Sequence, residues 1–199
     1  RQFLQEHTDN ASDGSRYTGT WKENQFAGEG TFEYANGDKY VGSWENGVQH
    51  GQGIYHFHTG ERYEGNYING QRTGQGVYLH ANGDKYVGDW KNDVQHGKGI
   101  YYFSSGDRYE GDYVSGGRTG NGIYYHANGD KYVGGFKDGE QHGKGTFTWS
   151  SGAVYEGDWV NNVREGKGRY VWANGDEYDG DWVNDMPHGE GSLNNADGS

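Results

Sequence analysis

Residues 40–57 read Tyr-Val-Gly-Ser-Trp-Glu-Asn-Gly-Val-Gln-His-Gly-Gln-Gly-Ile-Tyr-His-Phe, and this stretch decides the fold. Tyr, Gly and Trp alternate with other residues in its first half, and Gly, Gly, Tyr and Phe do so in its second. Alternation of this kind places each set on one face of an extended strand. Between the halves, Asn46-Gly47 is a pair that favours a tight two-residue turn. The stretch therefore predicts one β-hairpin.

The same pattern recurs every 23 residues along almost the whole chain. Each copy has a tyrosine, a glycine two residues later and, in most copies, an aromatic residue after a Gly-x-Gly pair. The tyrosines are Tyr17, Tyr40, Tyr63, Tyr86, Tyr109, Tyr132, Tyr155 and Tyr178. Eight copies without an insertion predict an all-β, elongated, single-layer antiparallel meander of about 16 strands. Because a ring lies flat across a neighbouring strand only where that strand lacks a Cβ, rings and glycines together predict a thin core.

The composition excludes several classes of protein and site. Glycine accounts for 39 of the 199 residues and aromatic residues for 32, whereas cysteine is absent. Without cysteine there is neither a disulfide nor a thiolate metal site or nucleophile. No apolar run approaches the ~20 residues of a membrane-spanning helix. A formal net charge of −12 argues against a nucleic-acid partner, since binding to the phosphate backbone needs clustered Lys and Arg.

The order Tyr-x-Gly-x-Trp, a short turn and then Gly-x-Gly-x-Tyr/Phe resembles the MORN (membrane occupation and recognition nexus) repeat. Residues 40–57, with His50-Gly51, match this pattern closely. We therefore expect an N-terminal extension at residues 1–14, the repeat array at 15–193, and an end at 194–199 where a further repeat would begin. The chain departs from the pattern at Ala27, Thr73, Thr119, Glu165 and Leu193.

The resemblance implies an elongated rod that acts as a non-catalytic scaffold or adaptor for protein–protein interaction. Some members of the family self-associate, others hold a partner peptide in a groove, and some precede an enzyme domain. A cytoplasmic or cytoskeleton-associated location is implied as well. We expect a protein or peptide partner and no cofactor, and the pattern leaves a homo-oligomer open.

One face of the predicted sheet carries the rings. The simplest interpretation is that every ring belongs to the core. A sheet of one layer has no second layer over that face, however, and exposed rows of aromatic side chains mark binding sites for peptides. We therefore expect an accessible partner-binding groove lined by Trp44, Tyr67, Trp90, Tyr113, Phe136 and Trp159.

The opposite face is predicted to be mostly polar, but it carries apolar residues in the middle repeats. Ordinary β-propensity at half-exposed positions explains such residues. The alternative hypothesis is that they form a stripe for self-association or partner docking. We call this set the apolar stripe: Ile54, Val77, Leu79, Ile100, Tyr102, Ile123 and Tyr125.

Neither a metal site nor a catalytic site is predicted. His50 recurs as His96, His142 and His188, but a spacing of 46 residues separates neighbouring copies by four strands, about 19 Å, too far for shared ligation. Each Asn-Gly-Asp turn offers only one carboxylate, unlike a calcium loop. Catalysis needs a unique constellation, whereas the polar groups of this chain recur in equivalent copies.

Two other functions compete with the scaffold. A phospholipid-headgroup module is suggested by the name of the family, but it would need a basic patch, and Lys39, Lys85 and Lys131 each follow an aspartate. A carbohydrate or cell-wall binder is suggested by repeated Trp, Tyr and Gly, since aromatic rings stack on sugars. The register of the repeat fits the MORN pattern better.

Overall fold

The computed structural model describes residues 5–199, which form 17 β-strands and no helix. The strands are β1 (Gln5–Asn10), β2 (Arg16–Lys22), β3 (Gln25–Glu33), β4 (Lys39–Glu45), β5 (Val48–His56), β6 (Arg62–Ile68), β7 (Gln71–Leu79), β8 (Lys85–Lys91), β9 (Val94–Tyr102), β10 (Arg108–Val114), β11 (Gly117–Tyr125), β12 (Lys131–Lys137), β13 (Glu140–Thr148), β14 (Val154–Val160), β15 (Val163–Val171), β16 (Glu177–Val183) and β17 (Met186–Asn194).

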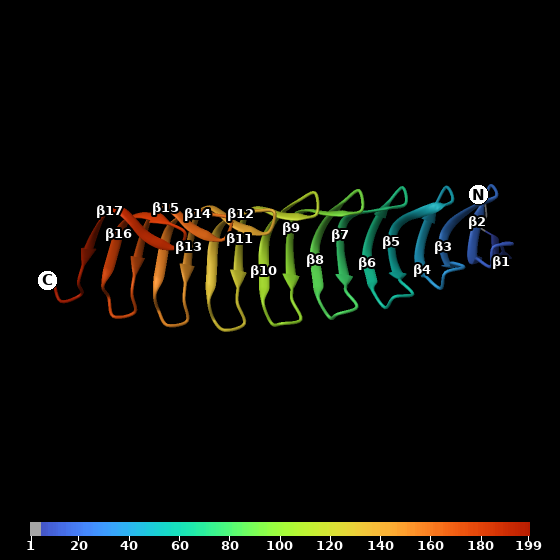
Figure 1. Cartoon of the computed structure of the whole chain (residues 1–199). Helices are drawn as coiled ribbons and strands as arrows, with labels where there is room; N and C mark the ends of the chain where they lie inside the picture. Colours follow the sequence, from blue (N-terminus) through green and yellow to red (C-terminus); the bar gives the residue numbers. More distant parts are fainter. Residues whose placement is uncertain (1–4) are drawn as a thin grey trace. The chain divides into compact units, whose positions relative to one another are not determined.

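The chain divides into two compact units, one ending at Gly97 and the other beginning at Lys98. In the first unit, β1 to β8 pair in chain order, each strand antiparallel to the next. In the second unit, β10 to β17 do the same. Figure 1 shows the strands of each unit side by side in a single layer. The predicted all-β, single-layer antiparallel meander is confirmed.

The strand beyond the expected 16 lies in the N-terminal extension. β1 pairs with β2, with Asp9 opposite Tyr17. The His7 ring stacks on Trp21 with 4.5 Å between centroids, so β1 covers the first ring of the array. The extension has no repeat pattern, and the sequence did not predict a strand there.

Seven of the 23-residue copies show one hairpin with a two-residue turn and a β-bulge. In the β4–β5 hairpin, Asn46 and Gly47 have φ values of 51° and 79°, the positive values that a type I′ turn requires. The register shifts between Gly42 and Trp44, so Ser43 is the extra residue of a bulge, which bends the strand. The same shift recurs in β2–β3, in β6–β7 and in the four hairpins of the second unit.

Tyr40 illustrates how a repeat forms its core. The residue has 0 % of its surface exposed, and its ring occupies the space that a Cβ on Gly53 of the facing strand would need. Its hydroxyl donates a 2.9 Å hydrogen bond to the backbone carbonyl of the bulge residue, Ser43. The equivalent tyrosine of every copy makes this bond. The predicted ring-over-glycine core is confirmed.

The buried rings also join each hairpin to the next. Tyr155 meets Trp159 of its own strand edge to face, with 5.2 Å between centroids and 87° between ring planes. It meets Trp182 of the following hairpin in the same way, at 5.2 Å and 83°. Such T-shaped pairs add roughly 0.5–1.5 kcal/mol beyond the burial of their area.

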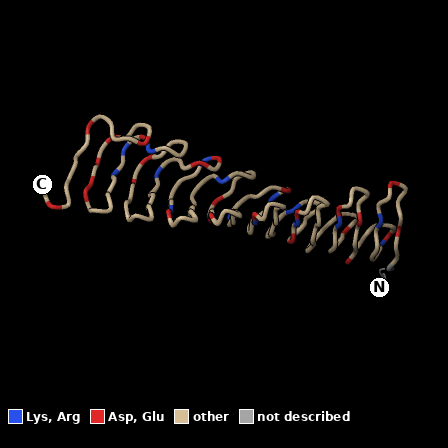
Figure 2. The backbone as a smooth tube through the Cα atoms, turned by 60° about the horizontal axis from the view of Figure 1, so that its bottom comes forward, with Lys and Arg blue, Asp and Glu red and all other residues tan. Residues whose placement is uncertain are grey.

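The opposite face is held together by polar cross-strand pairs. Figure 2 shows acidic and basic residues interleaved along the strands of each unit. In the second unit, the lysine between two glycines pairs with the bulge aspartate of the next strand, as in Lys98–Asp112, Lys144–Asp158 and Lys167–Asp181. Exposed pairs of this kind contribute about 0–1 kcal/mol each, so they mainly reinforce the strand register.

Candidate functional site

The six rings predicted to line an accessible groove are buried. Their exposed fractions are only 3–7 %, and they are Trp44, Tyr67, Trp90, Tyr113, Phe136 and Trp159. Several are covered by a ring from the preceding strand: the centroid of Phe147 lies 6.1 Å from that of Trp159. The expectation that these six rings keep accessible surface is therefore wrong. They belong to the core, and whatever surface this face offers belongs to other side chains.

A second series of rings lies over this core, and we call it the aromatic ladder. Each hairpin except the last, β16–β17, contributes two rings, one near the end of its second strand and one two residues later. Successive centroids are 4.5–5.9 Å apart within each unit. The ladder comprises Phe32, Tyr34, Tyr55, Phe57, Tyr78 and His80 in the first unit, and Tyr101, Phe103, Tyr124, His126, Phe147, Trp149, Tyr170 and Trp172 in the second.

The ladder presents accessible aromatic surface on this face of the sheet. Its rings are half-buried, except Trp172, which is 38 % exposed. The sequence carried a signal for it, because Tyr34, Phe57, Phe103 and Trp149 stand at multiples of 23 residues from one another. Sequence reasoning selected the Trp44 series instead, since that slot is the more regular one.

Carboxylates from the turns hold the ladder tyrosines in place. In the first unit, the Tyr55 hydroxyl donates a 2.8 Å hydrogen bond to Asp38 Oδ2, and the His58 backbone N–H donates one of 2.8 Å to Asp38 Oδ1. Burial alone would raise the pKa of Asp38, but the hydrogen bonds from His58 and Tyr55 outweigh it and lower the pKa to about 2. Asp38 is therefore a charged anchor under a ladder ring.

Asp107 has the same role in the second unit. Its carboxylate accepts hydrogen bonds of 2.7 Å from the Tyr124 hydroxyl and 2.8 Å from the Ala127 backbone N–H. The backbone bond from Ala127 is the main reason that its pKa is lowered. His126 Nδ1 lies 4.0 Å from Asp107 Oδ2. One carboxylate thus holds one ladder ring through a hydrogen bond and lies beside the next ring.

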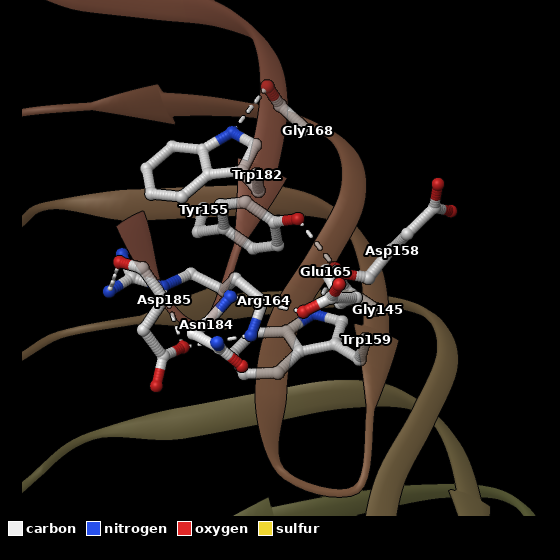
Figure 3. Close-up of polar contacts among 10 residues, drawn as sticks. All are labelled: Gly145, Tyr155, Asp158, Trp159, Arg164, Glu165, Gly168, Trp182, Asn184 and Asp185. Carbon is white, nitrogen blue, oxygen red and sulfur yellow. Dashed lines mark hydrogen bonds and ion pairs between the residues drawn. The ribbon is translucent and has the colours of Figure 1, made fainter. Parts of the chain in front are cut away.

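Two arginines lie among the rings, each held by an aspartate from the next hairpin turn. Arg164 Nε donates to Asp185 Oδ1 at 3.1 Å, and its Nη2 donates to the Asp185 backbone carbonyl at 2.8 Å (Figure 3). Its guanidinium carbon is 4.8 Å from the Trp182 centroid, within cation–π range. Arg72 repeats the arrangement in the first unit. Its Nε donates to Asp93 Oδ1 at 3.3 Å, and its Nη2 donates to the Asp93 backbone carbonyl at 2.9 Å.

The apolar stripe lies on the face opposite the ladder, as its alternation predicts. Its residues are half-buried, except Leu79 and Tyr102, which are 36 % and 37 % exposed. It is not continuous, because Glu64 stands between Ile54 and Val77 in the strand register. In the second unit, Arg108 covers Tyr125 at 4.2 Å from the ring centroid. Self-association through the stripe stays a prediction.

Basic side chains on the same face of the second unit line a shallow hollow of about 600 Å³. Lys167, at one side of it, pairs with Asp181, and Arg169 pairs with Glu177 at 2.5 Å. These cations therefore face carboxylates of the chain itself. Headgroup binding stays untested.

His50, the first of the recurring histidines, has local partners. His50 Nδ1 accepts a 3.2 Å hydrogen bond from the Asn69 backbone N–H, and its Nε2 lies 3.2 Å from Glu45. Over residues 7–199, the His, Asp and Glu side chains form no group of three placed to share a metal ion. The same residues include no helix of the length and apolarity that crossing a bilayer requires.

The family model of the MORN repeat matches eight consecutive segments: 17–39, 40–62, 63–85, 86–108, 109–131, 132–154, 155–177 and 178–199. No curated protein matches the chain. Among solved structures, the chain is similar to the SAS-4 TCP domain of Drosophila melanogaster, solved with a proline-rich motif of Ana2, at 14 % identity over 94 % of this chain and 88 % of that one, with a TM-score of 0.44. It is also similar to the TCP10 domain of Danio rerio CPAP, solved with a STIL peptide. The identity is 13 % over 96 % of this chain and 100 % of that one, with a TM-score of 0.38.

Proposed function

The chain belongs to the MORN repeat family, and we propose that it is a non-catalytic scaffold that binds an extended segment of a protein partner along the aromatic ladder. One observation carries the proposal: each unit presents a continuous row of half-buried rings on one side of a single-layer sheet. Rings that keep accessible surface in such a row are typical anchors of protein interfaces. The proposal assigns no catalytic residue, and it includes a cytoplasmic or cytoskeletal setting, which rests on family likeness.

The geometry of the repeat indicates what kind of segment fits. Two strands per hairpin at ~4.8 Å place equivalent rings about 9.6 Å apart. An extended or polyproline-II chain rises roughly 3.1–3.4 Å per residue. A partner running along the ladder therefore advances about three residues per repeat. In a polyproline-II chain, which has three residues per turn, every third side chain would then face the rings, whereas the side chains of an extended strand alternate between two faces.

Rigidity of the rings favours binding as well. Tyr55 and Tyr124 are tied to Asp38 and Asp107 through their hydroxyls, so their orientation is fixed before a partner arrives. Binding loses less conformational entropy when the receiving side chains are already ordered. The carboxylate anchors thus support the ladder as a preformed surface.

The test uses the chain with changes confined to its second unit. We expect peptides selected from a random library on the wild-type protein to bind Phe103→Ser/Trp149→Ser about tenfold or more weakly, as loss of central aromatic anchors predicts. The matched control is Val133→Ser/Val160→Ser, at side chains that are 42 % and 39 % exposed. Thermal unfolding of each variant checks that it folds.

If the peptides bound the ladder variant, Phe103→Ser/Trp149→Ser, as tightly as wild type, the proposal would be contradicted. Loss of binding in the control alone would place the partner on the face that carries the apolar stripe. Binding of headgroup-containing vesicles or of oligosaccharides, with no peptide binding, would favour one of the two competing functions instead.

A further inference from the structure

Three arginines occupy equivalent positions in alternate repeats, and one of them lacks the partner that the other two have. Arg72 and Arg164 pair with Asp93 and Asp185, each the second residue of the next hairpin turn. The corresponding turn residue for the third arginine, Arg118, is Gly139. A Cβ placed on Gly139 would lie 3.0 Å from Arg118 Nη2. In the other two repeats an aspartate side chain lies beside the guanidinium. Beside Arg118 the turn residue is a glycine, which has no side chain to take that place.

The ring beneath the guanidinium has changed as well. Arg164 has its nearest ring at Trp182, 4.8 Å from the guanidinium carbon, whereas the equivalent residue near Arg118 is Phe136. Arg118 lies over Phe103 and Tyr109, at 5.4 Å and 5.6 Å, as Arg164 lies over the equivalent Trp149 and Tyr155, at 5.7 Å and 5.8 Å. A smaller ring and a missing side chain at the turn together leave space.

That space is a cavity of about 370 Å³ within the second unit. It is lined by Arg118, Gly139 and Phe136, by the ladder rings Tyr124, His126 and Phe147, and by Gln141 and Asn162. Two buried polar atoms of the lining residues, Arg118 Nη1 and His126 Nε2, have no hydrogen-bond partner among the described residues. A buried donor without a partner is costly, and a guanidinium matches a carboxylate in geometry and charge.

We propose that this cavity is a carboxylate-binding subsite, in which Arg118 pairs with an Asp or Glu side chain of the partner segment. The carboxylate takes the place that Asp185 holds beside Arg164 (Figure 3). The proposal rests on the proposed function, because ladder rings form part of the cavity wall and the occupant is a side chain of the segment that follows them. Charge complementarity selects the occupant: a cation that lacks its internal carboxylate receives one from the partner.

The chain itself supplies variants that test the subsite without disturbing the fold. Gly139→Asp restores the internal carboxylate, at a turn position where Asp93 and Asp185 already adopt φ values of 70° and 67°. Arg118→Gln introduces the residue that Gln49, Gln95 and Gln141 have at the same place. Gly116→Asp is the matched control, because an added Cβ there meets no atom within 4 Å.

The experiment measures the affinity of library-selected peptides for these proteins. We expect the peptides to share an acidic residue and to bind Gly139→Asp and Arg118→Gln roughly tenfold or more weakly than wild type and Gly116→Asp, as loss of a charge-assisted hydrogen bond predicts. Replacing the acidic residue of the peptide by its amide should cost the same factor on wild type and little on Gly139→Asp.

If the peptides bound Gly139→Asp as tightly as they bind wild type, the subsite would be overturned. The proposed function would survive that result if binding were still lost in Phe103→Ser/Trp149→Ser. If Phe103→Ser/Trp149→Ser still bound the peptides and still preferred those with an acidic residue, the subsite would stand and the proposed function would be overturned. A concentration-dependent dimer of wild type that Gly139→Asp abolishes would overturn the assignment to a partner segment, since the occupant would then be a second copy of the chain.

Discussion

The hydroxyl of Tyr155 donates a 2.8 Å hydrogen bond to the backbone carbonyl of Asp158, three residues further along the same strand. Asp158 is the bulge residue, and a bulge leaves one residue outside the regular strand pairing. The tyrosine hydroxyl therefore bonds to the backbone at the bulge, and its ring is held over Gly168 of the facing strand. Tyrosine, bulge and glycine are thus in direct contact within each hairpin that has this geometry.

This relationship predicts a large effect of a single methyl group. In Gly168→Ala the new Cβ would collide with the ring of Tyr155, and overpacking of this kind costs about 1–3 kcal/mol. We expect the free energy of unfolding in urea to fall by that amount. Gly117→Ala is the control, because a Cβ there has its nearest neighbours at 3.7 Å, and the change should be within about 0.5 kcal/mol. Equal losses in the two variants would show that backbone conformation, rather than the ring, is responsible.

The buried tyrosines predict unfolding in alkali. Burial raises the pKa of Tyr132 and Tyr155 to about 12 from the ordinary value of 10. A raised pKa in the folded state means that the stabilisation is complete below pH ~10 and is lost as the pH rises towards 12. We expect the buried tyrosines to ionise over the same narrow range of pH in which the circular dichroism of the strands is lost. Ionisation of Tyr132 and Tyr155 near pH 10 with the fold intact would contradict this account.

The anchor under Tyr55 predicts sensitivity to acid. The pKa of Asp38 is lowered to about 2, against 3.8 ordinarily, so its contribution is present above pH ~4 and is lost as the pH falls towards 2. Asp38→Asn should lower the free energy of unfolding at pH 7 by about 1–2 kcal/mol, and the difference from wild type should vanish near pH 2. Asp9→Asn, at an exposed position, controls for the loss of one charge. A difference that does not change with pH would mean that Asp38 acts through shape alone.

The hairpins were predictable because their signals are local. Alternation and the Asn46-Gly47 turn define a hairpin within one copy, and the 23-residue period repeats it. The bulge at Ser43 carries no such signal, and neither does β1, which forms only because β2 offers it a partner edge. Tertiary pairing decides both features.

The accessible face could be predicted only in part. Sequence alternation places Trp159 and Phe147 on the same side of the sheet, and it cannot state which ring covers the other. The bend at each bulge and the contact between rings of successive strands bury Trp159 and leave the ladder outside. The unpaired Arg118 was readable from the sequence, by comparing the turn residues Asp93, Gly139 and Asp185 across repeats, but its significance depends on the cavity.

The apolar stripe predicts self-association that charge would abolish. If Ile100 and Ile123 lie at the contact between two copies, Ile100→Lys/Ile123→Lys should convert a dimer to a monomer in size-exclusion chromatography with light scattering, since a buried unpaired ammonium is costly. The control Val114→Lys changes a side chain that is 49 % exposed and should leave the mass unchanged. A dimer that survives the double substitution, or a wild-type protein that stays monomeric over the concentration series, would count against the stripe.

The most direct test of the central claim is to map a bound peptide by nuclear magnetic resonance. A peptide selected on the wild-type protein is titrated into labelled protein, and the chemical-shift changes of side chains and backbone amides are assigned. The account predicts that the largest changes in the second unit fall on Tyr124, His126, Phe147 and Trp149, with the stripe residues Ile123 and Tyr125 little affected. Changes concentrated on the stripe, with the ladder unperturbed, would contradict it.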